Sequence, residues 1–208
     1  MSKAAQENER VRHALTEALF SWMKRKPFSE ITVTDLVMEA HVARVSYYRN
    51  FSSKESIIEE YIESIYQALS EDNPMPTFSF QEPRDALTKR FEHSFTCLLT
   101  RKSYILALYH NGFGSLVLET MNRVMEDAAG DMPHDSVERY HLYFLTGAAF
   151  NVLLQWLESG AIESPHDMAV ACAGFFMQNN RIGFLYGKGV SNEREHSDLE
   201  DPVSLFPI

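Results

Sequence analysis

The residues best suited to chemistry in this sequence lie close together near its N-terminus, in the segment ARVSYYRNF at 43–51. Two tyrosines stand between Arg44 and Arg49, and Lys54 follows the segment within three residues. An arginine can offer paired donors to guanine or bind a phosphate, and hydroxyl groups can bind a base edge or a phosphate. This combination of side chains predicts a small surface that binds a polyanion.

The charge distribution of the chain agrees with a local site of this kind. The whole chain carries a net charge of -10 at pH 7, which argues against a protein that coats nucleic acid generally. Residues 1–54 contain nine Lys and Arg against six Asp and Glu, whereas residues 55–208 contain ten against twenty-three. The asymmetry confines the expected polyanion contact to the N-terminal part of the chain.

The segments around this string carry the apolar spacing of helices. A first stripe recurs at i, i+4, i+7, i+8 and i+11, which is one face of an α-helix, and it ends before Pro27. The stripe consists of Val11, Leu15, Ala18, Leu19 and Trp22. Thr32, with Asp35 three residues later, predicts a capping box for the short helix TDLVMEA. A turn at His41 then leads into the short helix that carries the tyrosines.

A longer amphipathic helix is predicted after the string, where Ser52 and Glu55 have the spacing of a second capping box. Two short helices joined by a tight turn and braced by longer ones describe a helix-turn-helix, whose second helix enters a DNA major groove. The side chains that could contact either a base or the backbone are Arg44, Ser46 and Tyr47. Those that offer groups to phosphates are Tyr48, Arg49 and Lys54. The alternative is a basic, aromatic helix on an ordinary protein surface.

The longer stretch FSEITVTDLVMEAHVARVSYYRNFSSKESIIEEYI, residues 28–62, resembles the N-terminal signature of TetR-family transcriptional regulators. That signature has an I-T-V-x-D-L/I start, an A-G-V turn, a helix reading roughly S-x-x-x-Y-x-x-F, and then x-S-K-E-x-L. The positions that match in order and spacing are Ile31, Thr32, Val33, Asp35, Leu36, Ala40, Val42, Tyr48, Phe51, Ser53, Lys54 and Glu55. The remainder of the chain is similar to the family only in its length and helical content.

The resemblance implies a role for each residue of the DNA-reading surface. It makes Tyr48 and Lys54 anchors to the DNA backbone. It implies a base-facing set of Arg44, Val45, Ser46 and Tyr47. Arg49 and Asn50 would make mixed contacts, and Thr34 on the preceding helix could touch backbone or base.

Four positions depart from the family pattern. Arg44 stands where serine is usual, which adds a charge and length, and Asn50 stands where histidine is frequent, which keeps hydrogen-bonding capacity. His41 stands where glycine is usual in the turn, and a left-handed conformation there costs a residue with a Cβ about 1 kcal/mol. Val45 stands where small residues are common, so it could contact a thymine methyl group or limit close approach. None of these departures removes the motif, but each makes the target sequence hard to predict.

The C-terminal part is predicted to be helical throughout, which makes the chain all-α. After a proline-containing linker at 71–83, helices are expected at 84–100, 102–110, 115–128, 136–158 and 165–185. Gly160 is expected to cap the end of the helix at 136–158, and Ser164 the start of the helix at 165–185. Residues 1–52 are expected to form the three-helix helix-turn-helix domain. Residues 53–186 are expected to form a helical bundle that binds ligand and dimerises, with 53–70 as the connecting helix. Residues 187–208 are expected to be a disordered tail.

The family typically binds a small molecule among its C-terminal helices and releases DNA in response, and its final pair of helices forms a homodimer. Aromatic and polar residues at helical spacing supply the candidate pocket: Phe95, Tyr104, Tyr109, His110, Phe113, His141 and Phe144. The effector is unknown, and the aromatic content favours an apolar or flat molecule. The alternative is an ordinary core, because aromatic residues at helical spacing are usually core residues and single histidines usually satisfy local hydrogen bonds.

No cofactor, metal or catalytic residue is expected. His93 with Cys97, and His134 with Glu138 and His141, have helical ligand spacing but make no set of four. The sequence contains no nucleophile elbow, phosphate-cradling glycine loop or HExxH, so we expect no enzyme. Apolar surroundings predict reduced thiols at both cysteines, and the lack of an apolar membrane span favours a cytoplasmic protein.

The sequence therefore predicts a ligand-responsive repressor that binds a palindromic operator in double-stranded DNA as a homodimer. Two other readings stay open. The first is a helical small-molecule- or partner-binding protein whose helix-turn-helix no longer reads DNA, which the departures at His41 and Val45 suggest. The second is a helix-bundle enzyme, for which the sequence offers no positive sign.

Overall fold

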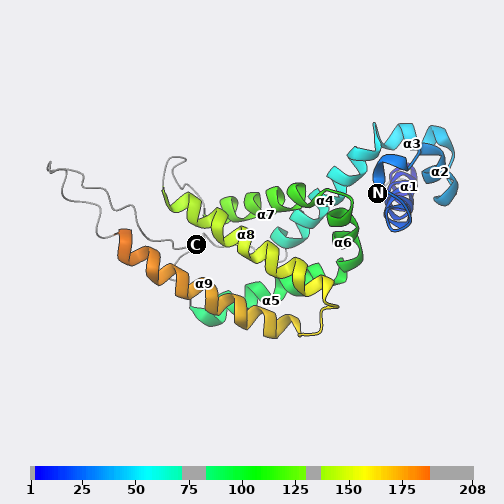
Figure 1. Ribbon diagram of the computed structural model, residues 1–208. Coiled ribbons are helices and arrows are strands. Elements are labelled where there is room, and N and C mark those ends of the chain that lie inside the picture. The colour runs from blue at the N-terminus through cyan, green and yellow to red at the C-terminus, as the bar shows by residue number, and fades with distance from the viewer. Residues whose placement is uncertain (1–2, 72–82, 130–136, 188–208) are drawn as a thin grey trace, which may run out of the picture.

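A computed structural model describes residues 3–71, 83–129 and 137–187, and these residues form nine α-helices, one 3-10 helix and no strand (Figure 1). The predicted all-α fold is confirmed. The elements are α1 (Lys3–Met23), η1 (Phe28–Glu30), α2 (Val33–Glu39), α3 (Arg44–Asn50), α4 (Lys54–Glu71), α5 (Arg84–Thr100), α6 (Lys102–His110), α7 (Gly114–Ala129), α8 (Val137–Glu158) and α9 (Pro165–Gly187). Nearly all of the predicted linker, the loop before α8 and the predicted tail lie outside the described residues.

Helices α1, α2 and α3 form one end of the molecule, and α4 leads from them into the C-terminal helices (Figure 1). In that second part α8 packs on α7, and α9 packs along α5. Helix α8 ends as predicted, because Gly160 adopts a left-handed φ of 104° just beyond it. Helix α9 also begins as predicted, with the Ser164 hydroxyl accepting from the Asp167 amide at 3.1 Å.

The predicted capping box at the start of α2 is present. The Thr32 hydroxyl accepts from the Asp35 amide at 3.1 Å, and an Asp35 carboxylate oxygen accepts from the Thr32 amide at 2.8 Å. The same carboxylate pairs with Lys26 at 2.8 Å. Lys26 and then Thr32 lower the pKa of Asp35 to about 2. These bonds fix where α2 begins, and hence the angle at which it leaves α1.

The turn between α2 and α3 has the conformation expected for its family position. His41 adopts φ 54°, which is the left-handed region, although it carries a Cβ. The Val42 amide donates to the Val37 carbonyl at 3.1 Å and closes the end of α2. The turn therefore keeps its shape without glycine, at a cost of about 1 kcal/mol.

The capping box predicted at the start of α4 is wrong by one residue. Ser53 and Ser56, rather than Ser52 and Glu55, exchange the hydrogen bonds: the Ser56 amide donates to the Ser53 hydroxyl at 3.2 Å, and the Ser53 amide donates to the Ser56 hydroxyl at 3.3 Å. The reason is that α4 begins at Lys54, so the residue in the capping position is Ser53.

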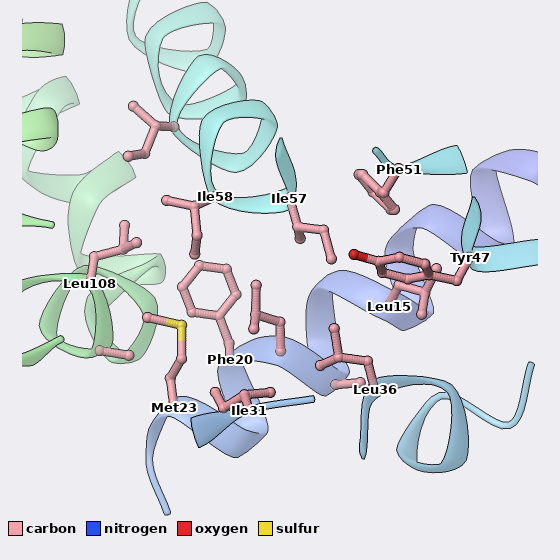
Figure 2. Close-up of a cluster of buried hydrophobic side chains, with 14 of the residues drawn as sticks. Leu15, Phe20, Met23, Ile31, Leu36, Tyr47, Phe51, Ile57, Ile58 and Leu108 are labelled. Carbon is pink, nitrogen blue, oxygen red and sulfur yellow. The ribbon is translucent and has the colours of Figure 1, made fainter. Parts of the chain in front are cut away.

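One hydrophobic core holds the N-terminal helices together and extends beyond them (Figure 2). Leu15, Leu36 and Tyr47 bring α1, α2 and α3 into contact. Ile58 from α4 and Leu108 from α6 belong to the same cluster, and both are fully buried. Helix α6 of the C-terminal part is therefore built into the base of the helix-turn-helix unit.

Cys97 and Cys172 are both thiols that form no disulfide, in agreement with the predicted reduced state. Among the helices of the described segments, none has both the length and the hydropathy needed to cross a bilayer.

Candidate nucleic-acid interface

The side of α3 that faces away from the core presents most of the predicted DNA-binding residues. Arg44, Val45 and Arg49 are exposed, and Tyr48 is 56% exposed. Thr34 on α2 is exposed beside them. A short helix with a basic, hydroxyl-bearing outer face has the shape and the donors that a major groove requires.

Three of these residues hold one another in place across the two short helices. The Arg44 guanidinium donates to the Thr34 hydroxyl at 3.2 Å and to the Tyr48 hydroxyl at 3.2 Å. It also lies 5.7 Å from the centre of the Tyr48 ring. We call Thr34, Arg44 and Tyr48 the α2–α3 clamp. Because the clamp orders the arginine before any partner arrives, less side-chain entropy is lost on binding.

The far end of α3 is fixed by a residue that the sequence reasoning did not consider. Arg12 on α1 donates to the Asn50 carbonyl at 2.8 Å and to Glu60 on α4 at 2.9 Å. Its guanidinium also lies 4.6 Å from the centre of the Phe51 ring. Asn50, predicted to contact DNA, is half-buried and donates its side-chain amide to the Ser46 carbonyl at 2.8 Å. Arg12 therefore sets the position of α3 without standing on its outer face.

The prediction that Tyr47 faces a base is wrong. Its side chain is only 1% exposed and lies inside the core, with the hydroxyl directed into the cluster (Figure 2). Helical rotation explains the difference, because Tyr47 and Phe51 are four residues apart and share the inward face of the chain. The Tyr47 hydroxyl has no hydrogen-bond partner, and burial raises its pKa.

Lys54 has a structural role that the sequence did not indicate. Its ammonium donates to the Phe28 carbonyl at 2.9 Å and to the Ile31 carbonyl at 2.6 Å, and it lies 4.5 Å from the centre of the Phe28 ring. Two of its three donors are thus used inside the protein, at the end of η1. The phosphate contact that the family resemblance implies for Lys54 stays a prediction.

Met38 is an exposed residue that the sequence reasoning missed. It stands on α2, four residues after Thr34, and therefore one turn along the same side of the helix. The spacing from Thr34 was the signal available in the sequence.

The C-terminal helices enclose a cavity of about 190 Å³, bounded by α4, α5, α7, α8 and α9. Its wall is almost entirely apolar and includes Leu87, Phe91, Leu98, Met121 and Met125. Such a hollow between helices is the usual form of a small-molecule site.

Only Phe95 of the predicted pocket residues lines this cavity. Tyr104 and Phe113 pack instead against the helix-turn-helix core, where the Tyr104 hydroxyl donates to Glu17. Burial, and then Glu17, raises the pKa of Tyr104 to about 12. The other four residues lie elsewhere: Tyr109, His110 and Phe144 are exposed, and His141 is half-buried on α8 away from the wall. The predicted pocket was thus misplaced, because aromatic residues at helical spacing serve core, surface and cavity alike.

Asn111, just after α6, joins the two parts of the molecule. Its side-chain oxygen accepts from the Phe28 amide at 2.8 Å, and its side-chain nitrogen donates to the Met23 carbonyl at 3.1 Å and the Ala107 carbonyl at 2.9 Å. One side chain therefore connects the end of α1, the start of η1 and the end of α6. A shift of α6 must move the helix-turn-helix unit or break these bonds.

The predicted metal-ligand spacings do not form a cluster in the part of the chain that is described. No three His, Cys, Asp or Glu side chains come together there. Cys97 instead accepts from Arg101 at 3.0 Å, and His134 lies outside the described residues.

The geometry defines a helix-turn-helix unit joined to a hollow helical domain, and known proteins share this arrangement. The chain is 25% identical over 189 residues to an uncharacterized HTH-type transcriptional regulator, YxbF, of Bacillus subtilis (strain 168). That match covers 86% of this chain but 48% of the relative, so the chain spans about half the length of the curated relative it matches. No family model matches the sequence.

Solved structures give the same result for the fold. A TetR transcriptional regulator from Streptococcus agalactiae 2603V matches with a TM-score of 0.60 and 18% identity, over 83% of this chain and 97% of that one. A TetR-family transcriptional regulator from Streptomyces coelicolor matches with a TM-score of 0.59 and 17% identity, over 86% and 83%. The chain therefore has the fold of TetR-family transcriptional regulators, in agreement with the resemblance of its N-terminal motif.

Proposed function

We propose that this protein is a TetR-family transcriptional regulator that recognises a specific DNA sequence with the outer face of α3. The α2–α3 clamp is the observation that carries the proposal. Two guanidinium donors of Arg44 bind the Thr34 and Tyr48 hydroxyls, which holds the group at the surface. Its other donors are available to bind guanine or phosphate. Val45 beside it offers an exposed apolar contact for a thymine methyl group.

The protein acts as a homodimer on a palindromic operator. Two recognition helices must lie about 34–36 Å apart to enter successive major grooves, and a twofold dimer meets that requirement on a palindrome. Exposed apolar side chains on α8 and α9, including Phe144 and Phe175, support these helices as the dimer face. The operator overlaps or adjoins a promoter, so that binding represses transcription.

A small molecule in the cavity releases the DNA. The bonds of Asn111 and the packing of Tyr104 on Phe20, with ring centres 4.6 Å apart, connect α6 to the helix-turn-helix unit. Helix α6 does not line the cavity, but it contacts α5, α7 and α8, which do. A ligand that moves these three helices would therefore move α6 and shift the distance between the two recognition helices. The shift in operator affinity equals the difference in ligand affinity between the two arrangements.

Selection from random duplex DNA tests this function. The purified protein, without added ligand, is incubated with a pool of random duplexes at low salt, and the retained DNA is sequenced beside that retained by Tyr48→Ala. We expect a palindromic site that the variant fails to enrich. If the folded dimer enriches no sequence, the DNA-reading function is wrong, and the cavity becomes the site of a ligand-binding protein without operator.

A further inference from the structure

We infer that a second copy of the chain closes the mouth of the cavity, so that a small apolar ligand binds the dimer more tightly than the single chain. The inference rests on the dimer of the proposed function and adds to it a link between ligand binding and assembly. It follows from where the cavity opens, from the surface around that opening and from the chemistry of the wall.

The cavity opens between α8 and α9. Two of its wall residues are exposed, Ala148 on α8 and Phe175 on α9, and Phe175 is 63% exposed. The remaining wall residues are buried or half-buried. A residue that both lines a cavity and faces solvent stands at its mouth. Helix α8 packs on α7 and α9 packs on α5, so the two helices flank the opening from opposite layers.

The exposed positions of α8 beside the mouth are apolar or neutral, and none of them is charged. Exposed positions on α8 recur every three or four residues, and from Tyr140 to Gln155 they are Tyr140, Phe144, Ala148, Asn151 and Gln155. The exposed apolar positions on α9 near the mouth are Val170, Ala171 and Phe175. Phe144 is 65% exposed one turn from the mouth. An uncharged face with large exposed aromatic residues is typical of a surface that another protein covers.

A second copy fits this face better than a different partner. The face contains large exposed rings, such as Phe144, and also the small exposed side chains of Ala148 and Ala171. In a twofold arrangement each copy contributes the same patch, so the rings of one copy can pack against the small side chains of the other. A charged partner would have to bury its charges against the exposed α8 positions from Tyr140 to Gln155, none of which is charged, and the nearest exposed charge on α9 is Asp167, one turn before Ala171. The face that assembles the dimer is thus continuous with the mouth of the ligand site.

The wall indicates a neutral, apolar ligand of about the size of one aromatic ring. An apolar cavity of about 150 Å³ is known to hold benzene, and this cavity measures about 190 Å³. The Thr146 hydroxyl already donates to the Leu142 carbonyl at 2.8 Å, and burial raises the pKa of the Cys172 thiol to about 11, which keeps it neutral. Ser94 is a further small polar group of the wall. Arg90 is the charged residue of the wall, and for that reason the test includes an anionic probe, 4-fluorobenzoate.

The test follows binding of 4-fluorotoluene by ¹⁹F NMR while sedimentation velocity reports the state of assembly. We expect wild-type dimer to bind the probe about fivefold or more tightly than the single chain, because closure of the mouth buries more of the apolar ligand surface. Phe144→Glu should give a single chain with this weaker affinity, although Phe144 does not line the cavity. By linkage, the probe should strengthen wild-type dimerisation by the same factor per site.

Two further variants locate the effect. Ile162→Glu changes an apolar residue that is 83% exposed in the turn between α8 and α9, outside the patch, and should leave both assembly and affinity as in wild type. Ser94→Phe fills the cavity and should abolish probe binding in a protein that still dimerises. If Phe144→Glu does not fold, dilution of the wild-type protein through its dimer dissociation supplies the same comparison.

The outcomes separate the two proposals. A wild-type protein that sediments as a single chain at every concentration contradicts the proposed dimer. A wild-type dimer whose affinity for the probe equals that of the single chain overturns the inference about the mouth and leaves the dimer standing. Tighter binding of 4-fluorobenzoate than of 4-fluorotoluene, or no binding of 4-fluorotoluene, overturns the ligand class.

Discussion

The outer face of α3 and the cavity of the C-terminal helices are built in different ways. At the outer face of α3 the important side chains are polar. Thr34 of α2 and Arg44 and Tyr48 of α3 lie within fifteen residues of sequence and hold one another by hydrogen bonds. The cavity wall is apolar and draws on five helices between Leu69 and Phe176. A substitution on the first surface should therefore change recognition and leave folding intact, whereas one in the cavity wall should change folding first.

Phe95→Ala is the variant with the largest expected effect on this comparison. Phe95 is buried, lines the cavity and lies 5.3 Å from the Trp156 ring, centre to centre. Its removal should lower the free energy of unfolding by about 3–5 kcal/mol, because the site loses apolar contacts and the cavity grows. Urea unfolding measures the loss. A change below about 1 kcal/mol would mean that the wall collapses around the gap and is less rigid than described.

Lys54→Met tests whether a residue of the family motif serves folding. Loss of two charged hydrogen bonds to the Phe28 and Ile31 carbonyls should lower the free energy of unfolding by about 1.5–3 kcal/mol. If folding is the whole role of Lys54, the salt dependence of DNA binding should stay as in wild type, whereas the phosphate contact implied by the family resemblance would reduce the salt slope by about 1. Arg49→Met, which changes an exposed cation on α3, is the matched control and should reduce the salt slope by about 1 with little effect on stability. The reverse pattern would make Lys54 a phosphate anchor.

Arg44→Ala removes the centre of the α2–α3 clamp. Affinity for the selected duplex should fall by about 1–3 kcal/mol, with a smaller change on a scrambled duplex, if the arginine reads a base. Stability should change little, because the side chain is exposed. Fluorescence anisotropy titrations on both duplexes measure the two affinities, with Lys89→Ala on α5 as an exposed cation away from the clamp. An equal loss on both duplexes contradicts base reading.

Tyr47→Phe should stabilise the protein by about 1 kcal/mol, because it removes a buried hydroxyl without a partner. DNA affinity should not change. Tyr48→Phe, its exposed neighbour, should leave stability unchanged and weaken DNA binding, since it removes a hydroxyl of the clamp. Thermal unfolding and DNA titration of the pair separate the two tyrosines. Weaker DNA binding by Tyr47→Phe would return Tyr47 to the reading surface.

His41→Gly has the smallest expected effect. Glycine adopts the left-handed φ of 54° without the steric cost that histidine bears, which should stabilise the turn by up to about 1 kcal/mol before the extra chain entropy of glycine is subtracted. Denaturant unfolding measures the difference, with His41→Ala as the variant that keeps a Cβ. Destabilisation by glycine larger than that by alanine would show that His41 makes a contact of its own.

Local rules in the sequence predicted much of the fold and part of the α3 face. The capping box at Thr32, the cap at Ser164 and the glycine at 160 are each read within four residues, and each lies where predicted. The difference between Tyr47 and Tyr48 was also available, because Tyr47 is four residues from Phe51 and shares its buried face. The family resemblance placed Tyr47 in the base-facing set with the exposed residues of α3, and so did not separate the buried side chain from the exposed ones.

The cavity could not be predicted in the same way. Phe95, Phe113 and Phe144 have the same character in sequence, but the first lines the cavity, the second packs edge-on to Phe28 at 4.9 Å, and the third is exposed. Which of these applies depends on how α5, α7, α8 and α9 are arranged, and that arrangement joins residues up to about a hundred positions apart. The roles of Arg12 and Asn111 were missed for the same reason, since their partners are 38 and 83 residues distant.

The salt dependence of operator binding tests the central claim most directly. The affinities of the wild-type protein for the selected palindrome and for a scrambled duplex are measured between about 50 and 200 mM salt. If the outer face of α3 reads DNA, both affinities fall linearly on a log–log plot, and the palindrome stays at least about a thousandfold tighter throughout. Equal affinity for the two duplexes, or binding that does not weaken with salt, would contradict the account.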